Sequence, residues 1–244
     1  MGSRLVFVVP CHGRHKIAAA CLRQLSRTCE QLAATIGATA VLISNEPRFE
    51  RLARELGFAH VSQTNQPLGR KWNDGIEHAV NELDADYVVP FGSDDIVDPA
   101  LIAARLPREG EIGCSRLSTV VSEDGRRLAH LNITYRGGDG VRTIPVSMLA
   151  KVGCRPAEDD RDRAMDTSMQ RKLMAAGVRP RLEYLDLHPL QLVDFKSRAG
   201  QLNDYAGCSL HYGTHESATV WSDLAEVYPA EFVDEMQRVY RSAR

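Results

Sequence analysis

The chain has 244 residues, of which 43% are hydrophobic and 25% are charged, and its formal net charge is −2. This composition is that of an ordinary globular protein, and the low net charge excludes a chain that binds nucleic acid or anionic lipid through its overall charge. No apolar stretch approaches the roughly 20 residues of a membrane span, and no signal peptide is recognised, so we expect a cytoplasmic protein.

The first part of the chain alternates predicted strands and helices. Apolar runs rich in β-branched residues predict strands at 5–10, 40–44, 60–62 and 87–91. Apolar residues spaced by about 3.6 positions predict helices at 15–36, 47–56 and 68–83. This alternation is typical of a parallel sheet covered by helices. We therefore expect an α/β fold with a Rossmann-like, mostly parallel sheet and helices on both faces.

The pattern changes after Asp98-Pro99. We expect a helix over 99–106, a hairpin made of 114–121 and 126–134, helices over 146–152 and 160–176, a strand over 190–195 and an amphipathic helix over 221–240. The six cysteines show no zinc-ligand spacing and are expected to be reduced core thiols. The whole chain, 1–244, is interpreted as one domain with two interlocked halves, 1–98 and 99–244.

The most informative segment is Gly92-Ser93-Asp94-Asp95, which follows the apolar run 87–91. Ligands of open α/β sheets bind at the carboxyl ends of the strands. Adjacent carboxylates repel each other and are most easily tolerated where a cation or the donors of a ligand neutralise them. An Asp-Asp pair is also common in solvated loops, so the pair alone leaves both interpretations open.

Four segments in this order resemble motifs of the GT-A glycosyltransferases, most nearly the inverting family-two type. They are VVPCHGR (8–14), NQPLGRKWNDG (65–75), FGSDD (91–95) and MDTSMQRKL (165–173). In that family the corresponding segments receive the nucleotide base, begin a helix, bind the metal and carry the catalytic base. The resemblance spans roughly residues 5–177. It implies a GT-A fold in which 1–98 bind a nucleotide-sugar and 99–244 the acceptor.

The resemblance implies a UDP-sugar donor and a bound Mn²⁺ or Mg²⁺, which acts as a Lewis acid on the leaving diphosphate. The metal ligands would be Asp95 and His188, with His211 as an alternative to His188. The other donor-binding candidates are Pro10, His12, Arg14, Asn45, Glu46, Gly69, Lys71, Asn73 and Asp94. Backbone N–H groups at Gly69 would bind phosphate. Alternatively, Asn45-Glu46 is a plain turn, Gly69 an ordinary helix entry and Lys71 a solvated side chain.

Asp166 is the candidate general base, because an inverting transfer needs one carboxylate to take the proton of the acceptor hydroxyl. The chain departs from the family pattern at Met165, where the family usually has Glu. The acidic run Glu158-Asp159-Asp160 is an alternative source of the base, and Asp166 is otherwise an exposed helix residue or cap.

The acceptor is expected to be either a hydroxymethylated pyrimidine in phage DNA or a glycan. Segments 194–197 and 202–205 loosely resemble the tails of bacteriophage DNA-modifying glycosyltransferases. The basic residues that could track DNA phosphates are Arg126, Arg127, Arg142, Arg171, Lys172, Arg179, Arg181, Lys196 and Arg198. Alternatively, these are solvated charges offset by the 32 acidic residues. The rival functions are a sugar-nucleotide nucleotidyltransferase and a non-catalytic carbohydrate- or nucleotide-binding protein.

Overall fold

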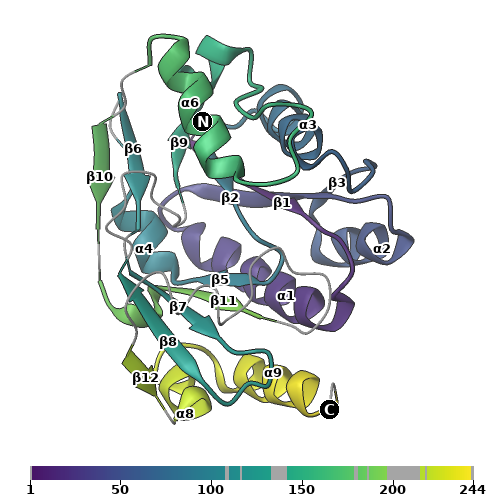
Figure 1. Cartoon of the computed structure of the whole chain (residues 1–244), viewed down its shortest axis with the longest axis vertical. Coiled ribbons are helices and arrows are strands. Elements are labelled where there is room, and N and C mark those ends of the chain that lie inside the picture. Colours follow the sequence, from purple (N-terminus) through teal and green to yellow (C-terminus); the bar gives the residue numbers. More distant parts are fainter. Residues whose placement is uncertain are drawn as a thin grey trace.

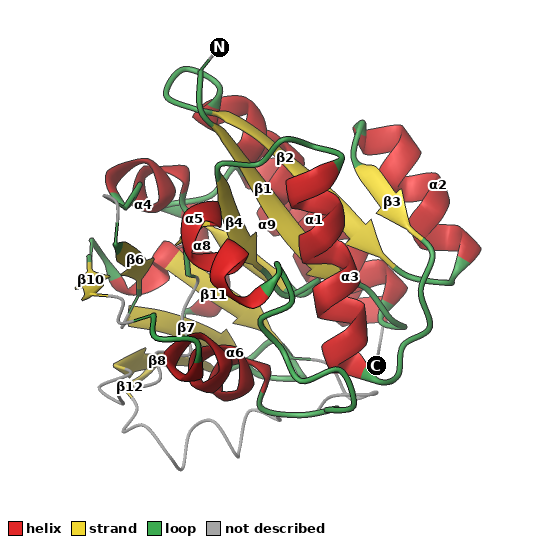
Figure 2. Ribbon diagram, turned by 90° about the horizontal axis from the view of Figure 1, so that it is seen from above, coloured by secondary structure: helices red, strands yellow, loops and turns green. Residues whose placement is uncertain are grey.

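The computed structural model of the chain describes residues 2–107, 110–115, 117–132, 142–178, 181–185, 187–196, 215–217 and 219–242. Its central layer is a five-stranded sheet in the order β3-β2-β1-β4-β9. The strands are β1 (Arg4–Pro10), β2 (Gly37–Ile43), β3 (Ala59–Val61), β4 (Tyr87–Pro90) and β9 (Ile144–Pro145). The first four are mutually parallel (Figure 2), whereas β9 is antiparallel to β4, which confirms the expected mostly parallel sheet.

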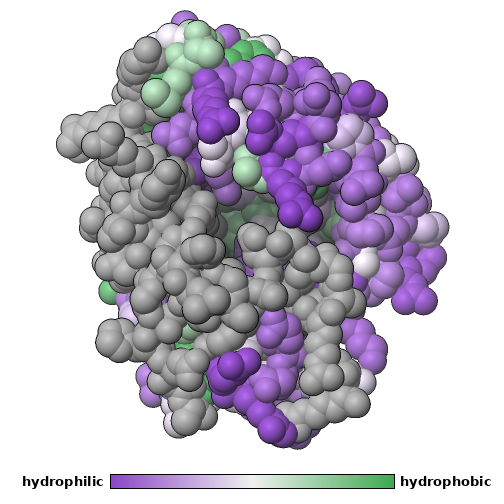
Figure 3. Space-filling model, viewed as in Figure 1, coloured by the Kyte–Doolittle hydropathy of each residue, from purple (hydrophilic) through white to green (hydrophobic). Residues whose placement is uncertain are grey.

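Helices α1 (His15–Leu32), α2 (Pro47–Leu56) and α3 (Leu68–Asn81) cover this sheet. Successive residues of a strand point to opposite faces, so the wholly apolar β1 contributes to two cores. Leu5 and Phe7 pack with residues of α1 and α2, whereas Val6 and Val8 pack with residues of α3. The expected helices on both faces are thereby confirmed, and Figure 3 shows hydrophilic side chains over the outer sides of α2 and α3.

A second five-stranded sheet has the order β12-β8-β7-β11-β5 and lies below the first in Figure 1. Its strands are β5 (Asp95–Val97), β7 (Leu117–Val121), β8 (Leu128–Asn132), β11 (Leu192–Phe195) and β12 (His215–Ser217). Helices α8 (Val220–Ala225) and α9 (Ala230–Ser242) lie beside it. A third core joins Ile96 and Phe195 of this sheet to Leu224, Phe232 and Met236 of these helices.

The other elements connect these layers. Strands β6 (Glu111–Cys114) and β10 (Arg181–Tyr184) form a parallel pair. The remaining helices of the described residues are α4 (Pro99–Ala104), α5 (Val146–Leu149), η1 (Ala150–Val152), α6 (Met165–Ala175) and η2 (Pro189–Gln191). Among the described residues, no helix is both long and apolar enough to cross a bilayer. The described cysteines are free thiols, and Cys11, Cys21, Cys29 and Cys114 are buried.

Several predicted elements differ from the structure in their bounds, and three of them differ for a clear physical reason. The helix expected over 160–176 begins only at Met165, because residues 158–162 bind the start of α3 instead. The helix expected over 221–240 is two helices, since Pro229 lacks the N–H group that a helix interior needs. The strand expected over 114–121 is also two elements, because β6 pairs with β10 and β7 pairs with β8.

Candidate active site

Three carboxylates meet at the carboxyl end of the parallel sheet. Asp94 follows β4, Asp95 begins β5, and Asp194 lies opposite Asp95 in the antiparallel pair of β5 and β11. One carboxylate oxygen of each residue lies within 4.8 Å of the others. Gly92 allows this close turn, since a Cβ atom there would lie 2.5 Å from Oδ2 of Asp95. The sequence analysis missed Asp194, although a single acidic residue inside an apolar strand was a usable signal.

Burial raises the pKa of Asp94 and of Asp95, and the nearby Asp194 charge raises both further. Two cations oppose this effect: Arg14 is paired with Asp94, and Lys196 is paired with Asp194. Oδ1 of Asp194 is buried and, within the described part of the chain, has no hydrogen-bond partner. A set of carboxylate oxygens with one unsatisfied acceptor suits a hard divalent cation such as Mg²⁺ or Mn²⁺.

His188 does not lie with this group. Its Nε2 atom is 2.8 Å from Oδ2 of Asp98, while Oδ1 of Asp98 accepts a hydrogen bond from the N–H of Ala100 at the start of α4. Among the described residues, the potential metal ligands that come together are the three carboxylates alone. Asp194 therefore stands where the sequence analysis expected His188, and His211 lies outside the described residues.

Glu46 lies at the same edge of the sheet, just after β2. Its carboxylate accepts a hydrogen bond of 2.9 Å from the N–H of Gly13 and lies 2.5 Å from Nε2 of His15 and 2.8 Å from Nδ1 of His12. Burial by itself would raise the pKa of Glu46, but these hydrogen bonds and the neighbouring histidines lower it below its usual value. Glu46 is therefore an ionised acceptor beside the β1–α1 loop. Asn45 is an exposed residue of the adjoining bend.

Lys71 of α3 is only 1% exposed, so the alternative interpretation of Lys71 as a solvated side chain is wrong. Its Nζ atom donates to the carbonyl of Cys11, 2.7 Å away, and to Oδ1 of Asn65, 3.2 Å away. Burial lowers the pKa of Lys71 to about 8, although the Glu46 charge opposes the shift. Because Cys11 follows Pro10, the last residue of β1, the structure brings Lys71 to the predicted base-binding end of this strand.

Gly69 and Asn73 have a different role from the one expected. The first N–H groups of α3 are already bound: that of Leu68 by Asp162, that of Gly69 by the carbonyl of Arg161 and that of Arg70 by the carbonyl of Asp159. A Cβ atom at Gly69 would lie 1.8 Å from the carbonyl oxygen of Glu158. The expectation of free N–H groups for phosphate at the start of α3 is therefore wrong. Gly69 instead allows the backbone of Glu158 to approach α3 closely.

Asn73 is fully buried and holds the same loop. Its Nδ2 atom donates to the carbonyl of Ala157 and to Oδ1 of Asp159, and its Oδ1 atom accepts from the N–H of Ala157. Arg155 adds ion pairs to Asp74 at 3.0 Å and to Asp159 at 2.7 Å. This network fixes the segment that leads into α6.

Asp166 lies in the first turn of α6 and is half-buried, and its backbone carbonyl accepts from Nη1 of Arg142. Of the alternative bases, Glu158 pairs with Arg161, and Asp159 is held by Asn73 and Arg155. The carboxylates of Glu158 and Asp159 are thus engaged within the loop that precedes α6. The role of Asp166 as the base stays a prediction.

The basic residues of the second half do not all lie on the surface. Lys196 is 6% exposed and Arg142 is 7% exposed, so neither can track the phosphates of DNA from an exposed face. Lys172 donates to the carbonyl of Ala157, whereas Arg126 and Arg127 are exposed. Arg179 and Arg198 lie outside the described residues. Two of the basic residues that were expected to track DNA phosphates are therefore buried.

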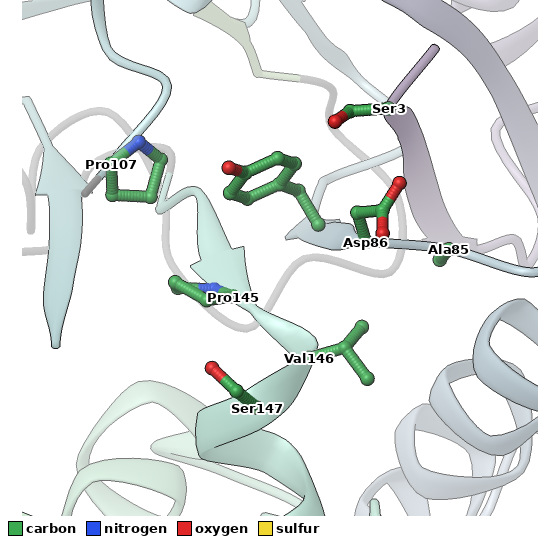
Figure 4. Close-up of a pocket in the computed structure, with 8 residues that line it drawn as sticks. Ser3, Ala85, Asp86, Pro107, Pro145, Val146 and Ser147 are labelled. Atoms are coloured by element: carbon green, nitrogen blue, oxygen red, sulfur yellow. The ribbon is translucent and has the colours of Figure 1, made fainter. Parts of the chain in front are cut away.

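A separate pocket of about 360 Å³ lies at the opposite end of the sheet (Figure 4). It lies beside Tyr87, where β4 begins, whereas the three carboxylates lie beyond the end of that strand. Its lining residues are Ser3, Ala85, Asp86, Tyr87, Pro107, Pro145, Val146 and Ser147. This pocket is distinct from the candidate active site.

No family model matches the sequence, and comparison with curated proteins gives no match. The structure resembles the catalytic domain of Drosophila β1,4-galactosyltransferase 7 in complex with xylobiose, with a TM-score of 0.56, 9% identity, and coverage of 83% of this chain and 75% of that one. A variant of that enzyme in complex with manganese, UDP-Gal and xylobiose is also similar, with a TM-score of 0.50 and 8% identity. That match covers 78% of this chain and 67% of that one.

The structure also resembles S. aureus TarS 1–349 in complex with UDP-GlcNAc, with a TM-score of 0.55 and 13% identity. That match covers 97% of this chain, which spans 65% of the TarS fragment. At such low identities these likenesses show the fold, which is the α/β fold of GT-A glycosyltransferases.

Proposed function

We propose that the chain is a metal-dependent glycosyltransferase that moves a sugar from a nucleotide-sugar to a hydroxyl group. The observation that carries this proposal is the cluster of Asp94, Asp95 and Asp194 at the carboxyl end of the parallel strands. Ligands bind at this edge in open α/β sheets. Structures of similar fold bind UDP-GlcNAc in one case, and manganese with UDP-Gal in another.

The donor that fits the charged groups best is a UDP-sugar. Glu46 and Lys71 present an ionised acceptor and a buried donor near the ends of β2 and β1. Uracil has an N–H group flanked by carbonyl oxygens, and this order complements a carboxylate beside an ammonium group. Cytosine lacks that N–H group, so it could not make the same contact with Glu46.

The proposed reaction is a single displacement with inversion at the anomeric carbon. The acceptor oxygen attacks that carbon while its proton passes to the carboxylate of Asp166, and the bond from the carbon to the diphosphate oxygen breaks. Asp94, Asp95 and Asp194 would hold the divalent cation, which supplies a Lewis acid for the leaving diphosphate.

A saccharide is the acceptor that the structure supports better. Similar structures of β1,4-galactosyltransferase 7 contain xylobiose. A hydroxymethylated pyrimidine in phage DNA is the second candidate, but burial of Lys196 and Arg142 removes two of the cations on which it depends. The two candidates differ in the salt dependence of binding. For duplex DNA, the logarithm of the binding constant falls against the logarithm of the salt concentration with a slope of about −0.9 per phosphate contact.

The test is product release from a panel of nucleotide-sugars with Mn²⁺. We expect release of a nucleoside diphosphate that depends on the metal and is lost in Asp95→Asn but kept in the exposed control Asp234→Asn. Full turnover in excess EDTA would contradict the proposal. Release of pyrophosphate on incubation with a sugar phosphate and a nucleoside triphosphate would instead show a nucleotidyltransferase. Tight nucleotide binding without turnover would show a binding protein.

A further inference from the structure

Two cations with largely enclosed side chains pair with the carboxylate cluster. Arg14 pairs with Asp94 and Lys196 pairs with Asp194, and the side chains of Arg14 and Lys196 are 18% and 8% exposed. With Asp95, three carboxylates face two cations, which leaves a formal net charge of −1. Burying unpaired charges is costly, so these pairs are what allows the cluster to exist in the free protein.

The pairing leaves two polar atoms unsatisfied. Oδ1 of Asp194 is a buried acceptor and Nε of Arg14 is a buried donor, and neither has a partner among the described residues. Buried polar groups in proteins are nearly always hydrogen-bonded. The Asp194 oxygen therefore needs a cation or a donor, and the Arg14 nitrogen needs an acceptor. A divalent cation and a diphosphate together would supply both.

We propose that Arg14 and Lys196 are exchangeable counter-ions: they hold Asp94 and Asp194 in the free protein and turn to the donor diphosphate when a divalent cation occupies the carboxylates. This inference rests on the proposed function. The cation changes the formal charge of the cluster from −1 to +1. A diphosphate that carries two negative charges then has a site of opposite sign, whereas it is repelled before the cation is bound.

The charged side chains of Lys196 and Arg14 can change partner while their backbones stay in place. Lys196 follows the end of β11, where its carbonyl accepts a hydrogen bond from the hydroxyl of Tyr240 and its N–H binds the carbonyl of Val121. Arg14 precedes α1, at a φ of 42°. The carbonyl of Arg14 accepts a hydrogen bond from the N–H of Ala18, so both main chains are anchored and only the side chains need to change partner.

This exchange predicts that Lys196 has opposite effects on the two ligands. Its charge competes with a metal for Asp194, so Lys196→Met should bind Mn²⁺ more tightly, by about tenfold. The same substitution removes a charged donor to the diphosphate, so affinity for UDP at saturating Mn²⁺ should fall by about tenfold. A residue with a purely structural role would weaken both.

The experiment measures Mn²⁺ binding from the electron paramagnetic resonance signal of the free ion, without nucleotide, and UDP binding by calorimetry with saturating Mn²⁺. The variants are Lys196→Met, Lys196→Arg, which retains the charge and should keep most of the UDP affinity, and Lys151→Met. Lys151 is an exposed residue of η1, and its substitution should change neither affinity.

Parallel losses or no change in Lys196→Met would overturn this inference while leaving the metal site intact. Absence of Mn²⁺ binding by the unmodified protein would instead overturn the metal dependence under the proposed function. If Lys196→Met does not fold by circular dichroism, Arg14→Met decides the question with the same pair of affinities, since Arg14 holds Asp94 in the equivalent way.

Discussion

Glu46 and Lys71 show how single residues acquire their chemistry from burial and partners. Glu46 is kept ionised by the N–H of Gly13 and by two histidines, and Lys71 loses part of its basicity because only 1% of it is exposed. The two side chains meet the carboxyl ends of β2 and β1, which places opposite charges where a base would lie. The charges of Glu46 and Lys71 are therefore the first to test as determinants of nucleotide affinity and base preference.

The affinity for UDP should fall as the pH rises through about 8, where Lys71 loses its proton. Because the folded-state pKa of Lys71 lies below its ordinary value, the cation is present below this range and lost above it. Calorimetric titration of UDP across this range should show the fall in the unmodified protein. Lys71→Met should bind UDP weakly at every pH. A pH-independent affinity in the unmodified protein would contradict a contact between Lys71 and the nucleotide.

Glu46→Gln should reduce the preference for UDP over CDP. The amide keeps the shape of the side chain but removes the charge that attracts the N–H group of uracil, so discrimination should fall by about tenfold to a hundredfold. Competition between UDP and CDP, measured with the same metal concentration, gives this ratio directly. Equal losses for the two nucleotides would mean that Glu46 supports the loop and does not read the base.

At the scale of elements, α3 joins the two functional regions of the chain. Lys71 points to the end of β1, while Gly69 and Asn73 bind residues 157–161, which lead into α6 and Asp166. The start of α3 is therefore the surface on which the loop of residues 157–162 packs. Its N–H groups are satisfied by that loop and are not a phosphate site.

Gly69→Ala should destabilise the protein by about 1–3 kcal/mol, in the range of an overpacked core. Alanine ordinarily favours a helix over glycine, but its Cβ atom would meet backbone atoms of Glu158 at 1.8 Å and 2.9 Å. Urea unfolding measures the change in the free energy of unfolding. Gly37→Ala is the control, because its Cβ atom would lie 3.7 Å from the carbonyl oxygen of Ser3, an ordinary contact, and its effect should be within about 0.5 kcal/mol. Equal stabilities of the two variants would exclude the close contact at Gly69.

At the scale of the whole molecule, the carboxylate cluster links the two halves. Asp94 and Asp95 belong to the first half, while Asp194 comes from β11, which pairs with β5 and with β7. A cation held by all three residues binds only the folded chain. It therefore acts as a link between the halves.

Mn²⁺ should raise the melting temperature of the protein, because a ligand that binds only the native state adds stability, about 2.7 kcal/mol at a concentration of 100 times Kd. The increase should be strongly reduced in Asp194→Asn and retained in Asp234→Asn. Thermal unfolding followed by circular dichroism measures both. An unchanged increase in Asp194→Asn would remove Asp194 from the metal site.

The sequence by itself determined the parts of this protein that depend on local pattern. Apolar runs and helical spacing identified the parallel sheet and its helices, and Asp94-Asp95 marked the carboxyl edge of the parallel strands as the candidate site. Glu46 and Lys71 were also identified as donor-site candidates, since each lies close in sequence to an element end. These features need only the period of side chains along a strand or helix.

Tertiary structure alone decided which distant residues meet. Asp194 joins the carboxylates through the pairing of β11 with β5, Lys196 is buried by the same sheet, and residues 158–162 occupy the start of α3 where a phosphate was expected. Such contacts depend on strand register and on the folding of one segment against another. No local period encodes them, because each arises from packing between elements that lie many residues apart.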